Sequence, residues 1–255
     1  MKSHSSRESE RKEIIRQQKL ITKHEKTIEK QKQIIARQLQ ALADSENALK
    51  VKDQLYLEAT KVIDGLLKLL TTLIELRDPY TKGHSVRVME ISLLLARHPN
   101  LESHLRENLV VFGYACLLHD IGKIVIPDYI LNKPVLLTEA ERLMIQQHTE
   151  LGFKLVEPLD LNPIIGEVIL NHHENFDGTG YPARLKGKEI PLTARIVRIA
   201  DVFDALTSDR PYRKAYSLEQ ALSIMEKQKS QFDPELYKIF LSLVRENKIL
   251  PPAPA

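Results

Sequence analysis

The stretch YACLLHDIGK, residues 114–123, is an apolar run that ends in adjacent His119 and Asp120 and a glycine. It predicts a buried helix over 102–121 that closes at two side chains of metal-ligand type. Neighbouring helical residues point about 100° apart, so both can face one centre only near a helix end or across two ions. Gly122 fits such an end. Cys116, inside the run, is expected to be a buried structural thiol.

The chain around this stretch reads as further short helices. Apolar periodicity predicts them over 83–97, 138–147, 162–172, 194–207, 217–227 and 233–246. The capping signals are Thr138 with Glu141, Ser217 with Gln220, and Asn162 and Asp233, each before a proline. No segment shows convincing strand alternation, although 184–191 is expected to form a small hairpin. The predicted fold class is therefore all-α, a helical bundle.

Five of the nine histidines stand beside carboxylates, glycines or one another: His84, His119, His148, His172 and His173. Successive candidates, with Asp120 and Asp201 included, are separated by 35, 28, 24 and 28 residues. Each interval fits one helix, a loop and part of a return helix. Successive helices of a bundle can therefore each present a ligand to the same interior point.

This group of side chains predicts a metal centre. One histidine on an apolar helix is often just a hydrogen-bonded core residue. A core seldom contains five histidines and two aspartates unless a metal offsets the cost of their desolvation. Mixed His/Asp sets suit Fe, Mn or Zn. Glu174, Asp177 and Asp204 lie close by in the sequence and are candidates to orient the histidine rings.

Longer motifs resemble those of the HD-GYP family, a branch of the HD-domain metal phosphohydrolases. They are HDIGK at 119–123, HHENFDGTGYP at 172–182 and ADVFDALTSDRPYRK at 200–214. RDPYTKGHSVRV at 77–88 and the lone His148 also stand where that family has them. HDxGK alone would indicate only the wider superfamily, whereas HHExxDGxGYP with RPYRK is highly specific. The resemblance covers residues 65–245.

The resemblance implies an HD-domain helical bundle that linearises cyclic di-GMP to pGpG and, in some members, continues to GMP. His84, His119, Asp120 and Asp201 would hold one ion, and His148, His172 and His173 the other, with Asp120 bridging. Some members bind a third ion through a glutamate four residues before the first histidine, where this chain has Tyr80. We therefore expect two divalent transition-metal ions, Fe or Mn in preference to Zn, Ni or Co.

The resemblance also implies the residues that act on substrate. Asp120 and Lys123 would be catalytic, with Lys123 on the scissile phosphate. The substrate contacts would be Lys123, Gly180, Tyr181, Pro182, Arg210 and Arg213. Fixed positive charge suits a dianionic substrate. Plainer interpretations stay open: the glycines make a good tight turn, Tyr181 can serve packing alone, and either arginine can form a surface ion pair.

The N-terminal part has a different pattern. Residues 11–76 contain no proline and one glycine, and an apolar or aromatic residue occupies every seventh position: Ile14, Ile21, Ile28, Ile35, Leu42, Leu49, Tyr56, Ile63 and Leu70. This spacing predicts a long coiled-coil-like helix. Only one of the two rows of a coiled-coil seam is apolar here. In the other row, each three positions after an apolar residue of the repeat, stand the polar residues Gln17, His24, Gln31 and Gln38. We expect a weak parallel homodimer through 11–60; the alternative is a lone amphipathic helix packed on its own domain.

Composition completes the expected organisation. We expect a helical extension over 1–62, a catalytic domain over 63–250 and a disordered tail over 251–255. The net charge is +3, with 13 Lys/Arg against 9 Asp/Glu in 1–60. Charges of both signs are mixed along this segment, so a nucleic-acid polymer is not an expected partner. One cysteine excludes a disulfide framework. Neither a membrane span nor a signal peptide is found, so the cytoplasm is the expected location.

Two other functions remain open beside cyclic di-GMP hydrolysis. One is hydrolysis of a different cyclic dinucleotide or nucleotide phosphate, which would need the same metal set. The other is a dinucleotide sensor or adaptor with low turnover, whose output passes through the N-terminal helix. The GYP loop and RPYRK favour cyclic di-GMP, and the complete ligand set with Lys123 favours catalysis.

Overall fold

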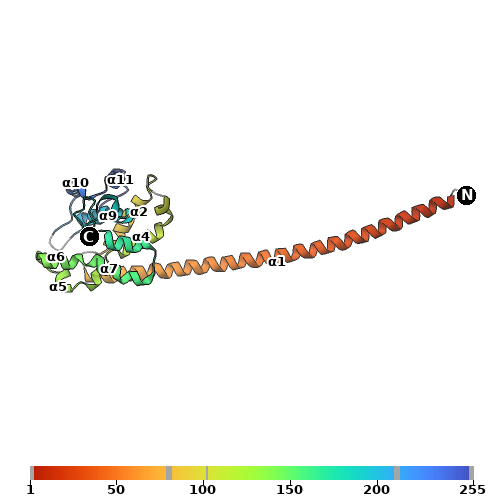
Figure 1. Ribbon diagram of the computed structural model, residues 1–255, viewed down its shortest axis with the longest axis horizontal. Helices are drawn as coiled ribbons and strands as arrows, with labels where there is room; N and C mark the ends of the chain where they lie inside the picture. The colour runs from red at the N-terminus through yellow and green to blue at the C-terminus, as the bar shows by residue number, and fades with distance from the viewer. Residues whose placement is uncertain (1–2, 79–81, 102, 210–212, 253–255) are drawn as a thin grey trace. The chain divides into compact units, whose positions relative to one another are not determined.

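The computed structural model of the protein describes residues 3–78, 82–101, 103–209 and 213–252, with the backbone alone at 3–14, 21, 27, 103 and 104. The chain divides into two compact units, Met1–Ile63 and Asp64–Ala255. The division falls inside the first helix, α1 (Ser3–Arg77), drawn red to orange in Figure 1. None of the described helices is long and apolar enough to cross a membrane.

The second unit is built from the end of α1 and a series of short helices. They are α2 (His84–Ala96), α3 (Ser103–Glu107), α4 (Leu109–Leu118), α5 (Asp128–Leu131), α6 (Glu139–Gln146), α7 (His148–Val156), α8 (Pro163–Asn171), α9 (Leu192–Thr207), α10 (Leu218–Lys227) and α11 (Pro234–Arg245). Short 3-10 turns lie between them: η2 (Ile121–Val125), η3 (Glu157–Leu159), η4 (Gly187–Glu189) and η5 (Lys229–Gln231). No β-strand occurs in the described ranges, and the predicted all-α class is confirmed.

The predicted helix starts are confirmed at their caps. Thr138 and Ser217 both form complete capping boxes. The side chains of Asn162 and Asp233 accept hydrogen bonds from the first turns of α8 and α11. Each of these polar side chains satisfies backbone N–H groups that a helix start leaves unpaired.

Two predictions of local structure are wrong. The single helix over 102–121 is instead α3, α4 and η2, because Asn108 adopts a non-helical backbone (φ −110°, ψ 20°). The hairpin over 184–191 is instead an irregular segment with the turn η4. Its backbone bonds go elsewhere: Ala183 N–H donates to the Glu174 carboxylate and Gly187 N–H to the Phe176 carbonyl. The helices α5 and α7 were not predicted.

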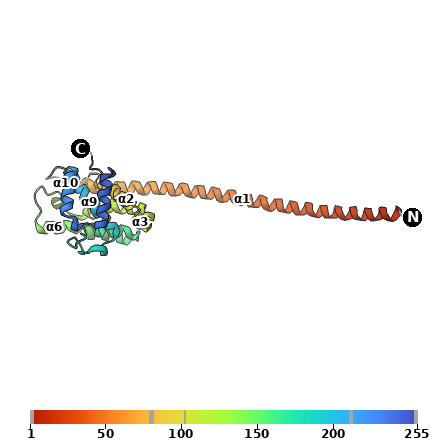
Figure 2. The same ribbon diagram turned by 90° about the horizontal axis from the view of Figure 1, so that it is seen from above.

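The hydrophobic core lies where α2, α4, α8, α9 and α11 pack on one another. Figure 2 labels two of these helices, α2 and α9. Its fully buried side chains include Leu95, Phe112, Ile169, Phe203 and Phe240. Cys116 lies in this core as expected, and burial raises the pKa of its thiol to about 12. The end of α1 joins the core through Ile74. These helices form the scaffold that positions the site.

Glycine allows α7 to lie directly against the η2 turn. A Cβ on Gly122 would be 1.9 Å from the His148 carbonyl oxygen and 2.6 Å from the Gly152 nitrogen. A Cβ on Gly152 would be 2.9 Å from Ile169 Cγ2. Gly122 is therefore required by a close approach of two backbones. That approach brings the start of α7, with His148, beside Asp120.

We expect Gly122→Ala to lower the free energy of unfolding by about 3 kcal/mol or more, because backbone must move to admit the methyl group. It should also weaken metal binding, since His148 is pushed from Asp120. Gly65→Ala is the matched control: nothing lies within 4 Å of its Cβ, and alanine should stabilise α1 by about 1 kcal/mol. Chemical denaturation and metal titration of both variants test this. Unchanged stability and metal affinity in Gly122→Ala would contradict it.

Candidate metal centre

The candidate ligands come from the ends of several helices. His84 and His148 are the first residues of α2 and α7, His119 and Asp120 follow α4, and His172 and His173 follow α8. Asp201 alone comes from a helix interior, that of α9. All seven are buried except His173, whose side chain is 19% exposed. The expectation that the adjacent pairs lie at helix ends is confirmed.

Three of the histidines close the C-terminus of the helix that precedes them. The carbonyls of Cys116 and Ile145 accept hydrogen bonds from Nδ1 of His119 (2.7 Å) and His148 (2.8 Å). Nδ1 of His172 lies 3.0 Å from the carbonyls of Val168 and Ile169. All four carbonyls lie in the last turn of a helix, where carbonyls commonly lack a partner within the helix, although Val168 also accepts from the His172 N–H. A carbonyl only accepts, so Nδ1 must carry the hydrogen and Nε2 keeps its lone pair.

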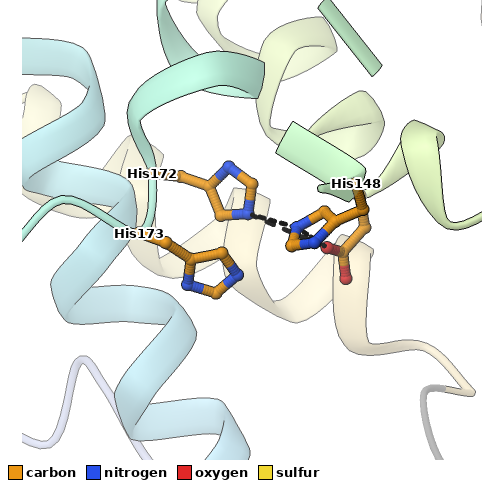
Figure 3. Close-up of side chains that lie close together, drawn as sticks. His148, His172 and His173 are labelled. Atoms are coloured by element: carbon orange, nitrogen blue, oxygen red, sulfur yellow. Dashed lines mark hydrogen bonds and ion pairs between the residues drawn. The ribbon is translucent and has the colours of Figure 1, made fainter. Parts of the chain in front are cut away.

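The Nε2 atoms of these rings converge on Asp120. Asp120 Oδ1 lies 3.2 Å from His148 Nε2 and 3.8 Å from His172 Nε2. Its other oxygen, Oδ2, lies 3.5 Å from His119 Nε2. Figure 3 shows the imidazoles of His148, His172 and His173 close to one another.

Among the described residues, two groups of ligand atoms are compact enough to hold an ion, and both contain Asp120. One is Asp120, His148, His172 and His173; the other is His84, His119 and Asp120. Asp201 is in neither group, but its two oxygens lie 3.3 Å from His84 Nε2 and 3.8 Å from His173 Nδ1. The arrangement places one carboxylate between two clusters of imidazoles.

The side chains fit divalent transition metals. His119 Nε2 is buried and has no hydrogen-bond partner in the described structure, which is costly unless an ion accepts its lone pair. The Nε2 atoms of His148 and His172 approach to 3.3 Å. Two lone pairs at that distance repel unless a cation or a proton lies between them. Imidazole and carboxylate are the donors that such metals prefer.

The electrostatics of most ligands also suit metal binding. Burial lowers the pKa of His119 to about 4 and that of His173 well below its usual value, so both rings are neutral. Burial alone would raise the pKa of Asp120 and Asp201, but neighbouring cationic and hydrogen-bonding groups hold both well below their usual range. Neutral imidazoles and ionised carboxylates are the ligand forms that bind.

His84 differs from these rings. Burial would lower its pKa, but hydrogen bonds and charge from Asp201 and Asp204 raise it to about 9 in the metal-free chain. An ion would therefore have to displace a proton from this ring. Asp204 contacts its Nδ1 at 2.7 Å, and Arg87 in turn binds both oxygens of Asp204, at 2.5 and 3.0 Å. Asp204 thus orients a histidine as expected.

The other two acidic candidates do not contact histidines. Glu174 accepts a hydrogen bond from the Ala183 N–H at 2.7 Å. Asp177 accepts from the N–H and hydroxyl of Thr179 and from the hydroxyl of Ser230. The expectation that they orient the histidine rings is wrong, since both carboxylates hold the loop that follows His173.

That loop places Tyr181 over the histidines. The Tyr181 ring stacks on the His173 ring at 4.8 Å between centroids. Gly180 passes so close to the backbone that its Cβ would lie 2.3 Å from the Asn175 nitrogen. Pro182 follows Tyr181 through a cis peptide bond. Both the tight-turn and the ring-packing interpretations of this loop therefore have structural support, and neither excludes substrate contact.

The remaining candidates are Lys123, Arg213, Arg210 and Tyr80. Lys123 Nζ lies 2.8 Å from Asp120 Oδ2, at the edge of the centre. The guanidinium of Arg213 donates to the carbonyls of Ala205, Leu206 and Lys214 and covers the Tyr216 ring. Its substrate role stays a prediction. Arg210 and Tyr80 lie outside the described residues, so the expectations for substrate binding and for the absent third ion stay open.

Sequence reasoning missed three charged residues around the site. They are Arg87, which holds Asp204; Asp78, which lies 3.4 Å from Lys123 Nζ; and Arg198. Arg198 donates to the side-chain oxygens of Asn175 (2.9 Å) and Gln231 (3.3 Å) and so ties α9 to the loop after His173. Asp78 and Arg87 both lie within RDPYTKGHSVRV, and this motif was the only feature of the sequence that could have indicated a role for them.

Comparisons with known proteins match this chain to one domain family and to relatives named phosphodiesterases. The HD domain family matches residues 68–236. A cyclic di-GMP phosphodiesterase of Pseudomonas aeruginosa is 37% identical over 79% of this chain and 48% of its own length. A 3′3′-cGAMP-specific phosphodiesterase of Vibrio cholerae is 37% identical over 78% of this chain and 41% of its own length. The chain thus spans about half the length of the curated relatives it matches.

One solved structure shows the same fold. It is a cyclic GMP-AMP-specific phosphodiesterase of V. cholerae, with 24% identity and a TM-score of 0.52. The match covers 72% of this chain and 49% of that one.

We expect Asp204→Asn to lower the affinity for metal by roughly 10–100-fold, because the carboxylate that orients His84 loses its charge. Asp177→Asn is the matched control: it removes a nearby acid that contacts Thr179 and Ser230 and no candidate ligand, so its effect on the affinity should be much smaller. Titration with Mn²⁺ or Zn²⁺ compares the two. Equal affinities for Asp204→Asn and the wild type would show that Asp204 does not support the metal centre.

Proposed function

The chain belongs to the HD domain family, and on this basis we propose that it is a metal-dependent phosphodiesterase that hydrolyses cyclic di-GMP to pGpG. The predicted resemblance to HD-GYP enzymes is confirmed by the family match and by the relatives named cyclic di-GMP phosphodiesterases. Since the chain spans only part of the length of those relatives, we infer its activity and substrate from its own residues. Further hydrolysis of pGpG to GMP belongs to the same proposal.

The geometry of Asp120 supports this function most directly. Its two oxygens face different groups of imidazoles, the arrangement expected of a carboxylate shared by two ions. In the proposed assignment, His84, His119, Asp120 and Asp201 hold one ion and His148, His172 and His173 the other. Fe or Mn is proposed ahead of Zn, Ni or Co. Such a pair lowers the pKa of a water molecule and balances charge on the attacking and leaving oxygens of a phosphodiester.

The chain's own residues would bind and orient the substrate. The ammonium of Lys123 lies beside Asp120, where it can neutralise a phosphate oxygen. The ring of Tyr181 stacks on that of His173 and can offer a flat surface to a guanine base. Gly180 and Pro182 fix where Tyr181 lies. Arg210 and Arg213 remain proposed contacts for phosphate or guanine.

A turnover assay tests the proposal. The chain would be purified without oxygen, its metal measured, and its activity compared with Fe, Mn and Zn. Lys123→Ala should keep its metal yet lose roughly 10²–10³-fold in kcat, the scale for one preorganised electrostatic group. Asp120→Ala should lose most metal and all activity. A wild type that cleaves bis-(p-nitrophenyl) phosphate but no cyclic dinucleotide would refute the substrate assignment.

A second candidate is hydrolysis of 3′3′-cGAMP. The V. cholerae relative with that specificity is as similar to this chain as the P. aeruginosa enzyme, at 37% identity each. Competition between the two dinucleotides in one reaction, expressed as the ratio of kcat/KM, separates the candidates. Tight binding of either dinucleotide without turnover by the metal-loaded wild type would instead support the sensor or adaptor function.

We also propose that the chain forms a parallel homodimer through α1. The described apolar residues at seven-residue spacing, from Ile28 to Leu70, are 40–63% exposed. Towards the end of α1 the polar row is replaced by Leu66 and Leu73, which are 55% and 46% exposed. There the leucines complete a seam of the kind that pairs helices, on a different face from the buried Ile74. A second copy of the chain is the partner that such a repeat fits.

Replacing Ile21, Ile28 and Ile35 together by Asn should raise the dissociation constant of this dimer, as should Leu66→Asn with Leu73→Asn. Lys61→Asn with Lys68→Asn removes two exposed residues outside the seam and should leave association unchanged. Sedimentation equilibrium over a range of concentrations measures all three. A wild type that stays monomeric at high concentration, or seam variants that dimerise as well as it does, would exclude the helix as a dimer interface.

A further inference from the structure

The last residue of α1, Arg77, binds the segment that carries Lys123. Its guanidinium donates to the carbonyls of Ile124 and Ile126 (2.8 Å to the latter) and to Asp128 Oδ1 at 2.6 and 3.1 Å. Its own carbonyl accepts a hydrogen bond from Asn132 Nδ2 at 2.8 Å. One side chain thus joins three points on either side of the end of η2, a bridge that the planar fork of arginine can make and lysine cannot.

The next residue, Asp78, contacts Lys123 itself. Asp78 Oδ2 lies 3.4 Å from Lys123 Nζ, and both side chains are largely shielded, at 11% and 15% exposed. The ammonium therefore lies between two carboxylates, Asp78 and Asp120, with Asp120 at 2.8 Å. Metal ions held by Asp120 would offset its negative charge. Asp78 would then be the stronger counter-charge for Lys123.

We propose that Arg77 and Asp78 are positioning residues for Lys123: Arg77 fixes the η2 turn, and Asp78 holds the ammonium at the edge of the metal centre. The inference rests on the proposed catalytic role of Lys123 and adds to it a link from the end of α1. A lysine ammonium is a point charge on a flexible stem, so its location depends on its counter-charges and on its backbone. Misplacement of a catalytic group by about 1 Å can cost about 10²-fold in rate.

The test measures the reactivity of Lys123 directly, without substrate. Mn-loaded protein would be treated briefly with acetic anhydride, and acetylation of each lysine followed by mass spectrometry. Asp78→Asn should increase the rate at Lys123 by about fivefold, the equilibrium factor for an ion pair worth about 1 kcal/mol. Arg77→Met should also increase it, by releasing the turn. Asp78→Glu, which keeps the charge, should restore much of the protection.

Glu141→Gln is the matched control. It breaks a comparable pair, in which Lys133 Nζ lies 2.7 Å from Glu141. It should raise acetylation at Lys133 and not at Lys123, whereas Asp78→Asn should do the reverse. Lys214, whose side chain is 92% exposed, reports the reagent's activity in every sample. Metal content and unfolding temperature are measured on the same samples.

The kinetic expectation is a fall in kcat for Asp78→Asn of roughly 10–100-fold with bound metal retained. Unchanged Lys123 acetylation in Asp78→Asn would overturn the positioning role, whatever the activity. If Arg77→Met fails to fold, Asp78→Asn decides alone. A wild type inactive on cyclic dinucleotides, with the acetylation pattern as expected, would remove the proposed substrate and leave the positioning of Lys123 standing.

Discussion

The hydrogen bond from a histidine Nδ1–H to a terminal helix carbonyl is the interaction on which the site depends. It recurs in His119, His148 and His172, each of which follows a helix and bonds to a carbonyl three residues back. One bond meets two needs: it pairs a carbonyl that the helix leaves open, and it sets the tautomer and direction of the ring. Helix ends thus carry most of the candidate ligands, and the packing of the bundle must bring those ends together.

Bringing these side chains together is electrostatically unfavourable. Charged side chains on several helices reduce that cost. Seven ligand-type side chains are held in a largely apolar body, where unpaired polar atoms are expensive. Asp120 offsets part of the cost by facing both groups of rings. Arg87 and Asp204 extend the network outward from His84. Hydrogen bonds and charge from Asp201 and Asp204 raise the pKa of His84 despite its burial.

Close backbone contacts hold this polar network in position. Gly122 lets η2 lie on α7, and Gly180 lets the loop after His173 fold onto its own backbone. Glu174, Asp177 and Arg198 then fasten that loop, and Arg77 fastens the segment after η2. Precise ligand geometry requires such rigid support behind the ligands. The end of α1 belongs to this support through Arg77, which binds the segment next to Lys123.

The sequence by itself determined the all-α class, the helix caps, the seven candidate ligands and the family resemblance. Those conclusions depend on local periodicity, capping chemistry and short motifs, which are properties of neighbouring residues. Only the tertiary structure decided the break at Asn108, the loss of the hairpin at 184–191 and the places of Glu174, Asp78 and Arg77. Each of these depends on a partner distant in the chain or on a backbone bond made elsewhere. Tertiary contacts set the balance there, because an exposed turn or a single charged side chain has several local options of nearly equal energy.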